Sequence, residues 1–466
     1  MKGLPNLGVS MGNPVNKRTA LAVASLSFFL ATFMGSSINI ALPSIGRELQ
    51  MDAIMLGWVA TSYILASVIF LLPSGRLADI YGRKRILTYG ILIYTISSLL
   101  LSFTPSATVL IALRAVQGIG GAMIFATGVA LVTSVFPPEE RGKALGITVA
   151  VAYLGLTLGP VLGGPLTQHF GWRSIFLATV PLGATAIALT LGKVKGDWAE
   201  AKGEKFDRIG SAIYGLALTG IIYGFSLLPE MLGIWLIIAG ASGILAFVKR
   251  QMKLEHPLLD INLFRKNRVF AFSNLAVLLN YSAAFAVGFL LSLYLQYIKG
   301  LSPQNAGLIL VAMPAVQAIF SPLAGRLSDR IEPRILASVG MGLTAAGLSL
   351  FIFLSEKTSF GLIIGSLIVL GFGFALFTSP NTNAIMSSVE QRFYGVASAT
   401  MATMRQIGMS FSMGITMLLF ALYIGRVEIT PEYYSSFLIS VRTAFIIFTA
   451  LCTAGIFASL VRGKTQ

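Results

Sequence analysis

The chain has 466 residues, of which 55% are apolar and only 11% are charged, and its formal net charge is +16. This composition excludes an ordinary soluble protein, and the positive charges lie between apolar runs rather than on one helical stripe, which argues against nucleic-acid binding. Cys452 is the only cysteine, and His169 and His256 lack metal-ligand spacing, so no disulfide, metal or cofactor is expected and the chain is not expected to be an enzyme.

Apolar runs long enough to cross a membrane as a helix, which takes about 20 residues, recur along the chain. No run shows the short alternating pattern of a membrane β-barrel. The sequence therefore predicts an all-α polytopic membrane protein with 14 transmembrane helices. The predicted spans cover residues 20–42, 54–74, 86–104, 107–135, 144–167, 172–192, 209–228, 231–248, 269–297, 304–324, 335–354, 359–386, 395–424 and 438–461.

The distribution of Lys and Arg predicts which way these spans run. With both termini in the cytosol, the outer side holds six of the 34 Lys and Arg, namely Arg47, Arg173, Lys299, Lys357, Arg426 and Arg442. Arg114 and Arg405 fall inside spans, and the other 26 are cytosolic. This bias fits the positive-inside rule, so we expect a multi-pass protein of the inner or plasma membrane with both termini cytosolic.

A polar loop occurs twice and predicts an internal repeat. GRLADIYGRKRIL begins at Gly75, and GRLSDRIEPRIL begins at Gly325 after a shift of eight spans. Six helices, two extra helices and six helices give that shift. We therefore expect two six-helix bundles with a two-helix insert. The expected parts are a cytosolic tail (1–18), an N-terminal bundle (19–192), the insert with its flanking cytosolic loops (193–268) and a C-terminal bundle with a short tail (269–466).

The repeated loop also predicts a moving contact. Gly75 and Asp79 in the first copy match Gly325 and Asp329 in the second, and the first copy adds Gly82 and Arg83. Glycines permit a sharp turn and a close approach of helix ends. A carboxylate such as Asp79 could pair with an arginine and with a helix N-terminus across the interface of the two halves. A basic loop that only sets topology would need the arginines but not the aspartates, so we favour a functional latch.

Two further motifs lie within spans. Arg114 is embedded in an apolar run, where a charge is costly and needs a polar surrounding and a partner, and Gln117 and Gly118 lie one turn further on. The alternative, an arginine that reaches the membrane surface, is weak because apolar residues continue on both sides. Close helix packing, with or without a functional role, is also expected along one face of the following span, which carries Gly155, Gly159, Pro160 and Gly163.

Other polar residues inside spans are candidates for substrate binding. In any membrane bundle such residues more often form hydrogen bonds between helices, so each keeps that alternative. A proline beside asparagines could also open a helix toward a central cavity. The candidates are Asn39, Arg114, Asn280, Tyr281, Gln317, Asn381 and Arg405.

The three motifs, in this order and at these places, resemble those of the major facilitator superfamily. Trp172-Arg173, the stretch around Asn39 and the RQIG at Arg405 resemble its fourteen-helix drug:proton antiporter branch, which performs multidrug efflux. The resemblance covers essentially the whole chain. It implies two bundles, a central site in mid-membrane, alternating access and export of small amphipathic compounds.

One departure from that branch concerns the driving force. The branch usually carries an aspartate in helix 1 nine residues before the proline, and this chain has Met34 there. None of its 18 Asp and Glu lies deep in a span, whereas an embedded carboxylate is the usual proton carrier and the usual partner of a cationic drug. Protons thus remain only one candidate coupling ion.

Two other functions stay open, a facilitator or exporter of a neutral or anionic metabolite and a non-transporting receptor or scaffold. The expected partners are a small-molecule substrate and the lipid bilayer, and the chain is expected to act as a monomer.

Overall fold

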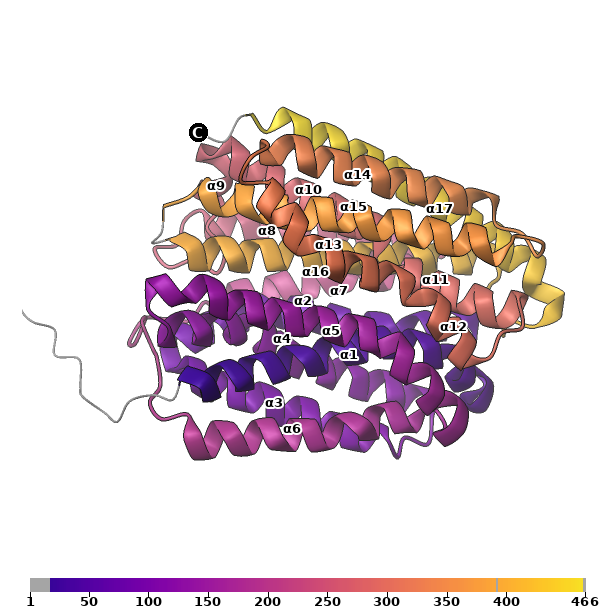
Figure 1. Cartoon of the computed structure of the whole chain (residues 1–466), viewed down its shortest axis with the longest axis horizontal. Coiled ribbons are helices and arrows are strands. Elements are labelled where there is room, and N and C mark those ends of the chain that lie inside the picture. Colours follow the sequence, from indigo (N-terminus) through magenta and orange to yellow (C-terminus); the bar gives the residue numbers. More distant parts are fainter. Residues whose placement is uncertain (1–16, 391–392, 464–466) are drawn as a thin grey trace, which may run out of the picture.

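The computed structural model describes residues 17–390 and 393–463, and all regular structure within these ranges is helical. Fourteen helical segments of this part are long and apolar enough to cross a membrane, which confirms the predicted fold class. Successive spans run in opposite directions, so both ends of the described chain lie on one face, at the left of Figure 1. We call this the terminal face and the opposite one the far face. The predicted cytosolic tail falls mostly outside the described residues.

The first bundle contains six long helices, drawn in indigo to magenta in Figure 1. Asp52 caps the second of these helices by accepting a hydrogen bond from the Met55 amide at 2.7 Å, and Ser106 caps the fourth through Val109. The helices are α1 (Lys17–Leu49), α2 (Ala53–Tyr81), α3 (Arg83–Leu101), α4 (Ala107–Val135), α5 (Pro138–Phe170) and α6 (Arg173–Lys193).

The second bundle repeats the first. The pairings α1 with α5, α2 with α4 and α3 with α6 recur as α10 with α16, α13 with α15 and α14 with α17. Its first span is broken and ends in a π-helical turn, and its second span is also in two pieces. The segments are α10 (Arg268–Ala284), α11 (Val287–Leu293), η1 (Tyr294–Ile298), α12 (Pro303–Leu310), α13 (Ala312–Leu327), α14 (Pro333–Leu350), η2 (Phe351–Phe353), α15 (Phe360–Ser387), α16 (Tyr394–Tyr423), η4 (Pro431–Tyr433) and α17 (Tyr434–Val461).

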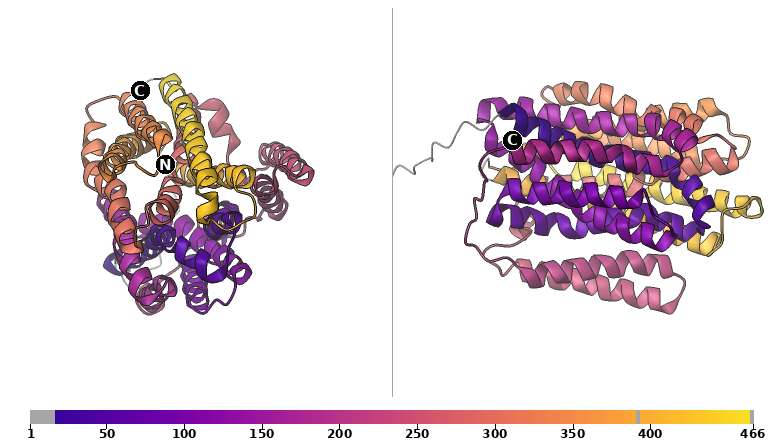
Figure 2. Two further views of the ribbon diagram at one scale, coloured as in Figure 1. Left: turned by 90° about the vertical axis from the view of Figure 1, so that its right-hand side faces the viewer. Right: turned by 90° about the horizontal axis from the view of Figure 1, so that it is seen from below.

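The insert is a hairpin of α7 (Arg208–Leu227) and α8 (Met231–Gln251) that stands beside the bundles, as Figure 2 shows. Its two helices approach closely because Gly224 and Gly233 face each other, and a Cβ on either would lie within 2.8 Å of the other's carbonyl oxygen. Its helix α7 packs on both bundles, on α2 of the first and on α16 of the second. The linker after α8 contains a short helix that the sequence did not predict, α9 (Ile261–Lys266).

The two bundles contact each other most closely near the far face. A Cβ on Gly307 of α12 would lie 2.3 Å from the Pro160 carbonyl oxygen of α5, and one on Gly164 would lie 2.8 Å from the Pro303 carbonyl oxygen. The Ala53 amide at the start of α2 donates to the carbonyl of Val427 at 3.0 Å. These glycines therefore let the backbones of the two bundles touch at this end.

Candidate functional site

The motif loop turns at Gly82. Gly75 lies inside α2, and a Cβ there would meet only Ala126 at 4.0 Å, so Gly75 makes no turn and is not tightly packed. Gly82, with a φ of 115°, ends α2 and precedes α3. Because this backbone conformation is strained for other residues, the need for glycine in this loop falls on Gly82.

Asp79 forms the predicted pair with an arginine, and the arginine is Arg83. The guanidinium of Arg83 donates from Nη2 at 3.0 Å and from Nε at 3.2 Å to Asp79 Oδ1, and from Nη1 to Ser134 Oγ at 2.6 Å. All three residues belong to the first bundle. The described residues thus show no pairing of Asp79 across the two halves.

The linker between α6 and α7 supplies the other carboxylates around this loop. Glu200 accepts two hydrogen bonds from Arg83, each 2.8 Å long, and Asp197 accepts one from the Lys84 amide at the N-terminus of α3 at 3.0 Å. Glu204 pairs with Arg76 and, at 3.0 Å, with Nδ1 of His256. This acidic linker covers the basic loop and caps its helix, which is favourable at a positive helix end.

The second copy of the loop is arranged differently. Gly325 lies inside α13, and Asp329 is exposed with no side-chain partner among the described residues. Glu332 pairs instead with Arg334 two residues on, at 3.1 Å. Asn383 of α15 donates to Ser328 Oγ at 3.3 Å and attaches this loop to the second bundle. The two copies of the loop are therefore similar in sequence but differ in their ion pairs in this conformation.

Arg114 lies wholly inside the first bundle. Only 1% of its surface is exposed, its Nε donates to the Val59 carbonyl at 3.1 Å and its Nη1 donates to Gln117 Oε1 at 2.5 Å. Gln117 donates in turn to Ser98 Oγ at 2.8 Å, and the Tyr63 ring faces the guanidinium at 4.6 Å. Gln117 is thus a partner of Arg114, which was expected to need one, and this network joins α2, α3 and α4.

The predicted glycine face of α5 packs on α1 of the same bundle. A Cβ on Gly155 would lie 2.9 Å from the Phe29 carbonyl, and one on Gly159 would lie 3.0 Å from the Phe33 carbonyl. Gly163 faces Ser37, whose hydroxyl donates to the Gly159 carbonyl at 3.0 Å. Gly118 on α4 is packed equally tightly, since a Cβ there would lie 2.3 Å from the Tyr63 carbonyl oxygen. The small residues thus allow close packing within the bundle, while the Pro160 carbonyl contacts Gly307 of the other bundle.

Arg405 differs from Arg114 in its surroundings. It lies on α16 in mid-span, is partly exposed, and its guanidinium lies 5.9 Å from the centroid of the Phe125 ring on α4. No hydrogen bond or ion pair of Arg405 occurs within the described residues. A cation–π contact is worth about 0.5–2 kcal/mol, far less than full hydration of a charge, so this arginine keeps its capacity for an anion or another acceptor.

Residues of both bundles converge around Arg405. Tyr153 of α5 lies near Arg405 and Tyr281, and near Gln317 and Ser321 of α13. Tyr281 also packs edge-on against Phe374 at 5.7 Å. We call the residues Phe125, Tyr153, Tyr281, Gln317 and Arg405 the central cluster. The structure thereby brings together three of the predicted substrate-binding candidates, Tyr281, Gln317 and Arg405.

The other candidates lie apart from this cluster. The Asn39 carbonyl accepts from Ser292 at 2.6 Å in the contact near the far face. Asn280 is fully buried beside Cys452. Asn381 donates to the Ser273 carbonyl and accepts from buried Arg462 at 2.6 Å, so both of its amide atoms are occupied. Burial lowers the pKa of Arg462 to about 10.

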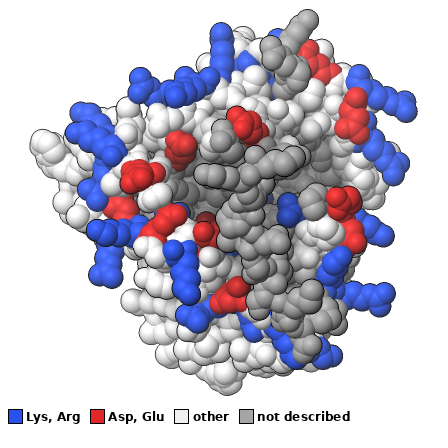
Figure 3. All heavy atoms as spheres, turned by 90° about the vertical axis from the view of Figure 1, so that its left-hand side faces the viewer, with Lys and Arg blue, Asp and Glu red and all other residues white. Residues whose placement is uncertain are grey.

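Acidic residues of the described chain are confined to the ends of helices and to loops. Those within helices are Glu48, Asp79, Glu139, Glu140 and Glu432. Met34 is buried and apolar at the position discussed above. Figure 3 shows Lys and Arg around the rim of the terminal face, with Asp and Glu among them. The embedded charge in the described spans is therefore positive.

Two pseudo-symmetric six-helix bundles that meet at one face and share a cluster of polar and aromatic residues in mid-span have the architecture of a secondary transporter. The chain belongs to the Major Facilitator Superfamily, whose family profile matches residues 24–413 and again residues 273–465. This confirms the family predicted from the motifs.

Individual relatives agree with this assignment. The riboflavin transporter RibZ of Clostridioides difficile is 30% identical over 443 residues, which are 94% of this chain and 96% of RibZ. The multidrug resistance protein Stp of Mycobacterium tuberculosis is 32% identical over 404 residues, 85% of this chain and 74% of Stp. A crystal structure of a bacterial homolog of the lysosomal transporter Spinster, inward-facing and unoccupied, superposes with a TM-score of 0.69 at 15% identity, over 97% of this chain and 98% of that one.

Sequence reasoning missed three parts of the site. Tyr153 and Phe125 of the central cluster look like ordinary span residues, and only the fold places them beside Arg405. Gly164 and Gly307 were not singled out, although Gly164 extends the glycine run that begins at Gly155. The acidic linker between α6 and α7 was expected only as a cytosolic loop that flanks the insert. Its spacing of acids opposite a basic loop was a usable signal.

Proposed function

We propose that this chain is a secondary active transporter that exports small amphipathic compounds across the cell membrane by alternating access, with the terminal face in the cytosol. The observation that carries the proposal is the central cluster, to which both bundles contribute, lying between bundles whose closest contacts are near the far face. A site shared by two bundles changes its access when the bundles rotate about it. In this orientation the conformation is closed toward the outside.

The compounds that suit the central cluster are planar and neutral or anionic. Phe125, Tyr153 and Tyr281 offer aromatic rings for stacking, and Arg405 offers an unpaired cation. Export by relatives supports the drug-like class, since Stp is a multidrug resistance protein and CmcT of Amycolatopsis lactamdurans, 32% identical over 410 residues, is a cephamycin export protein.

A second candidate is transport of a neutral or anionic metabolite without proton coupling. The lack of an embedded carboxylate in the described spans favours it, and so does the unpartnered Arg405. RibZ, a riboflavin transporter, shows that a relative of this similarity carries a planar metabolite. Both candidates need the same moving bundles, and they differ in substrate and in driving force.

The experiment that tests both uses the full chain in proteoliposomes. Uptake of riboflavin, of anionic and cationic dyes of matched size, and of a cephalosporin is followed with and without a pH gradient. Transport of any of these above empty liposomes, abolished by Arg405→Gln, supports the proposal. Transport of cationic dyes alone, unchanged in Arg405→Gln, would contradict the assignment of the central cluster as the binding site.

A further inference from the structure

A polar cavity at the far face lies between the two bundles and is separate from the central cluster. Its volume is about 270 Å³, slightly below the roughly 300–1,000 Å³ of cavities for drug-sized ligands. The end of α1 forms one wall, and η1, the segment before η4 and the start of α17 form the other. The polar residues used below are Arg47, Gln296, Tyr297 and Glu428.

The floor of this cavity has an unpaired acceptor. Gln296 is 5% exposed, and its Nε2 donates to the Ile40 carbonyl at 3.0 Å and to Ser292 Oγ at 3.1 Å. Its Oε1 is buried and has no hydrogen-bond partner. Leaving a buried acceptor unpaired costs about 1–3 kcal/mol, so the site favours a molecule that brings an N–H or O–H donor.

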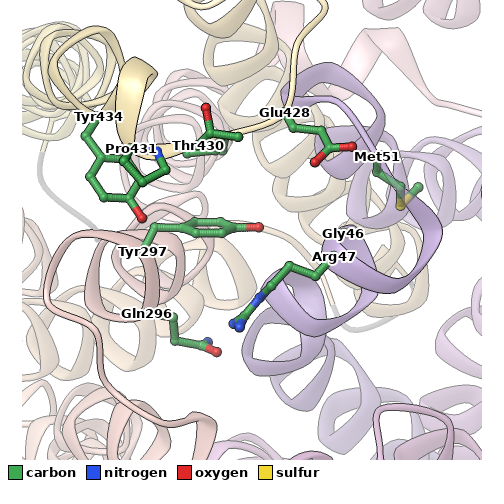
Figure 4. A pocket seen from close by; sticks show the side chains of 10 residues that line it. Gly46, Arg47, Met51, Gln296, Tyr297, Glu428, Thr430, Pro431 and Tyr434 are labelled. Atoms are coloured by element: carbon green, nitrogen blue, oxygen red, sulfur yellow. The ribbon is translucent and has the colours of Figure 1, made fainter.

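Opposite charges stand on the two sides of the cavity without pairing. Arg47 comes from the first bundle, and only its Nε is engaged, with the Pro43 carbonyl at 3.3 Å. Glu428 comes from the second bundle, and its carboxylate has no partner in the described chain. Figure 4 shows both side chains directed into the cavity, with the Tyr297 ring and Gln296, which belong to η1 of the second bundle, opposite α1. The neighbouring Arg426 already pairs with Glu230 at 3.6 Å.

We propose that this cavity binds a small zwitterion, a compound with one carboxylate and one ammonium group about the size of an amino acid. The carboxylate would bind the guanidinium of Arg47, and the ammonium would donate to acceptors such as Glu428 and Gln296 Oε1. The Tyr297 ring supplies a flat apolar wall for the part between the two charges.

Binding there has a consequence for the moving bundles. The cavity exists only while the far-face ends of α1 and η1 lie side by side, because each bundle supplies part of its wall. A ligand that binds one conformation stabilises that conformation. A zwitterion in this cavity therefore holds the far face closed. When added on the outer side, it inhibits transport without being transported itself.

The test uses the full chain in lipid nanodiscs and 4-(aminomethyl)benzoate as the zwitterionic probe. Benzylamine and 4-methylbenzoate are matched probes that each lack one charge. We expect the zwitterion to raise the thermal unfolding midpoint and to show saturable binding, and neither matched probe to do so at the same concentration. Arg47→Gln and Glu428→Gln should each weaken zwitterion binding about tenfold or more, which is one power of ten in Kd. Arg426→Gln, beside the cavity but outside it, should leave binding unchanged.

Three outcomes would overturn the proposal. One is a lack of binding by the zwitterion, and another is equal binding by either matched probe. The third is unchanged binding in the double variant Arg47→Gln with Glu428→Gln. Binding without inhibition of transport from the outer side would overturn the state-holding part alone. Since binding is measured without transport, failure of this site and failure of the transport proposal are distinguishable.

Discussion

Arg83 binds Glu200 through two parallel hydrogen bonds of 2.8 Å while it also donates to Asp79. One arginine of the motif loop is thus shared between a carboxylate of α2 and a carboxylate of the linker. Glu200 is 69% exposed at its side chain and Asp79 is 37% exposed. Exposed ion pairs contribute only about 0–1 kcal/mol, so the less exposed Asp79 should matter more.

We expect Asp79→Asn to reduce transport sharply while leaving expression nearly intact, and Glu200→Gln to change it by roughly fivefold at most. Transport in proteoliposomes and the amount of purified protein measure the two effects. Glu255→Gln, another acidic residue of the linkers beside the terminal face, is the matched control. Full activity of Asp79→Asn would return this loop to the alternative of a basic segment that only sets topology.

Replacement of the two embedded arginines should affect different properties, transport for Arg405 and stability for Arg114. Arg405→Gln should abolish or strongly reduce transport without lowering the unfolding midpoint, because Arg405 makes no hydrogen bond to any described residue. Arg114→Gln should lower stability by about 1–3 kcal/mol, because it breaks the buried contacts to Val59 and Gln117. Thermal unfolding and transport are measured on the same preparations. A destabilised Arg405→Gln with normal transport per folded molecule would contradict the assignment.

The driving force is the third prediction. We expect weak or absent proton coupling through a central carboxylate, because no Asp or Glu of the described chain lies in mid-span and Met34 is apolar. Arginine cannot carry the proton, since its guanidinium stays protonated over the whole working pH range. Transport is followed with imposed pH gradients of both signs. A steep dependence on the gradient together with a cationic substrate would restore a standard drug:proton antiporter.

The membrane orientation is testable with single cysteines. Replacements in the linkers, such as Lys202→Cys and Lys253→Cys, should be labelled only after the cytosolic side is exposed, whereas Glu230→Cys should be labelled from outside. The native Cys452 is buried and gives little background. Labelling of a linker site and of Glu230→Cys from the same side would refute the proposed orientation.

The insert hairpin should have a pH-dependent stability. Burial alone would raise the pKa of Asp207, but hydrogen bonds from Arg250, the Gly210 amide and Gln251 lower it overall. A carboxyl whose folded-state pKa lies below the unfolded value of about 3.9 stabilises the fold above that pH, and this contribution is lost as the pH falls through the folded-state pKa.

We therefore expect Asp207→Asn to cost roughly 2 kcal/mol at neutral pH and almost nothing in strong acid. The unfolding midpoints of both proteins, measured from neutral pH to strong acid, give this difference in stability. Asp260→Asn is the control, since Asp260 caps only the short helix α9. An Asp207→Asn effect that does not shrink in acid would contradict the assigned ion pair.

The sequence predicted the spans because hydrophobic length and the need to pair every backbone group leave few choices within a membrane. It predicted the duplication because a polar loop between spans is conspicuous. It could not separate Arg114 from Arg405, since both are single cations in apolar runs. Their difference arises from neighbours distant in the chain, Val59 for one and Phe125 for the other.

The broken spans of the second bundle show another limit. The sequence predicts one continuous helix over 269–297, whereas the structure has α10, α11 and a π-helical turn. Apolar length alone does not record a local change in hydrogen bonding, and such turns occur often at functional sites. This turn positions Gln296 and Tyr297 at the far-face cavity.

The insert hairpin packs on α2 through α7, where Gly215 faces Ile69, and on α16, where Gly414 faces Phe225. One helix is thus attached to both bundles, and the other, α8, presents Leu232, Trp235 and Leu245 outward. When the bundles rotate relative to each other, α7 must shift along at least one of these two glycine contacts. The lateral pressure of the surrounding lipid on α8 is therefore transmitted through α7 to its contacts with α2 and α16. We expect transport rates to depend on bilayer composition through this hairpin, and filling the Gly414 contact with a larger side chain to weaken that dependence.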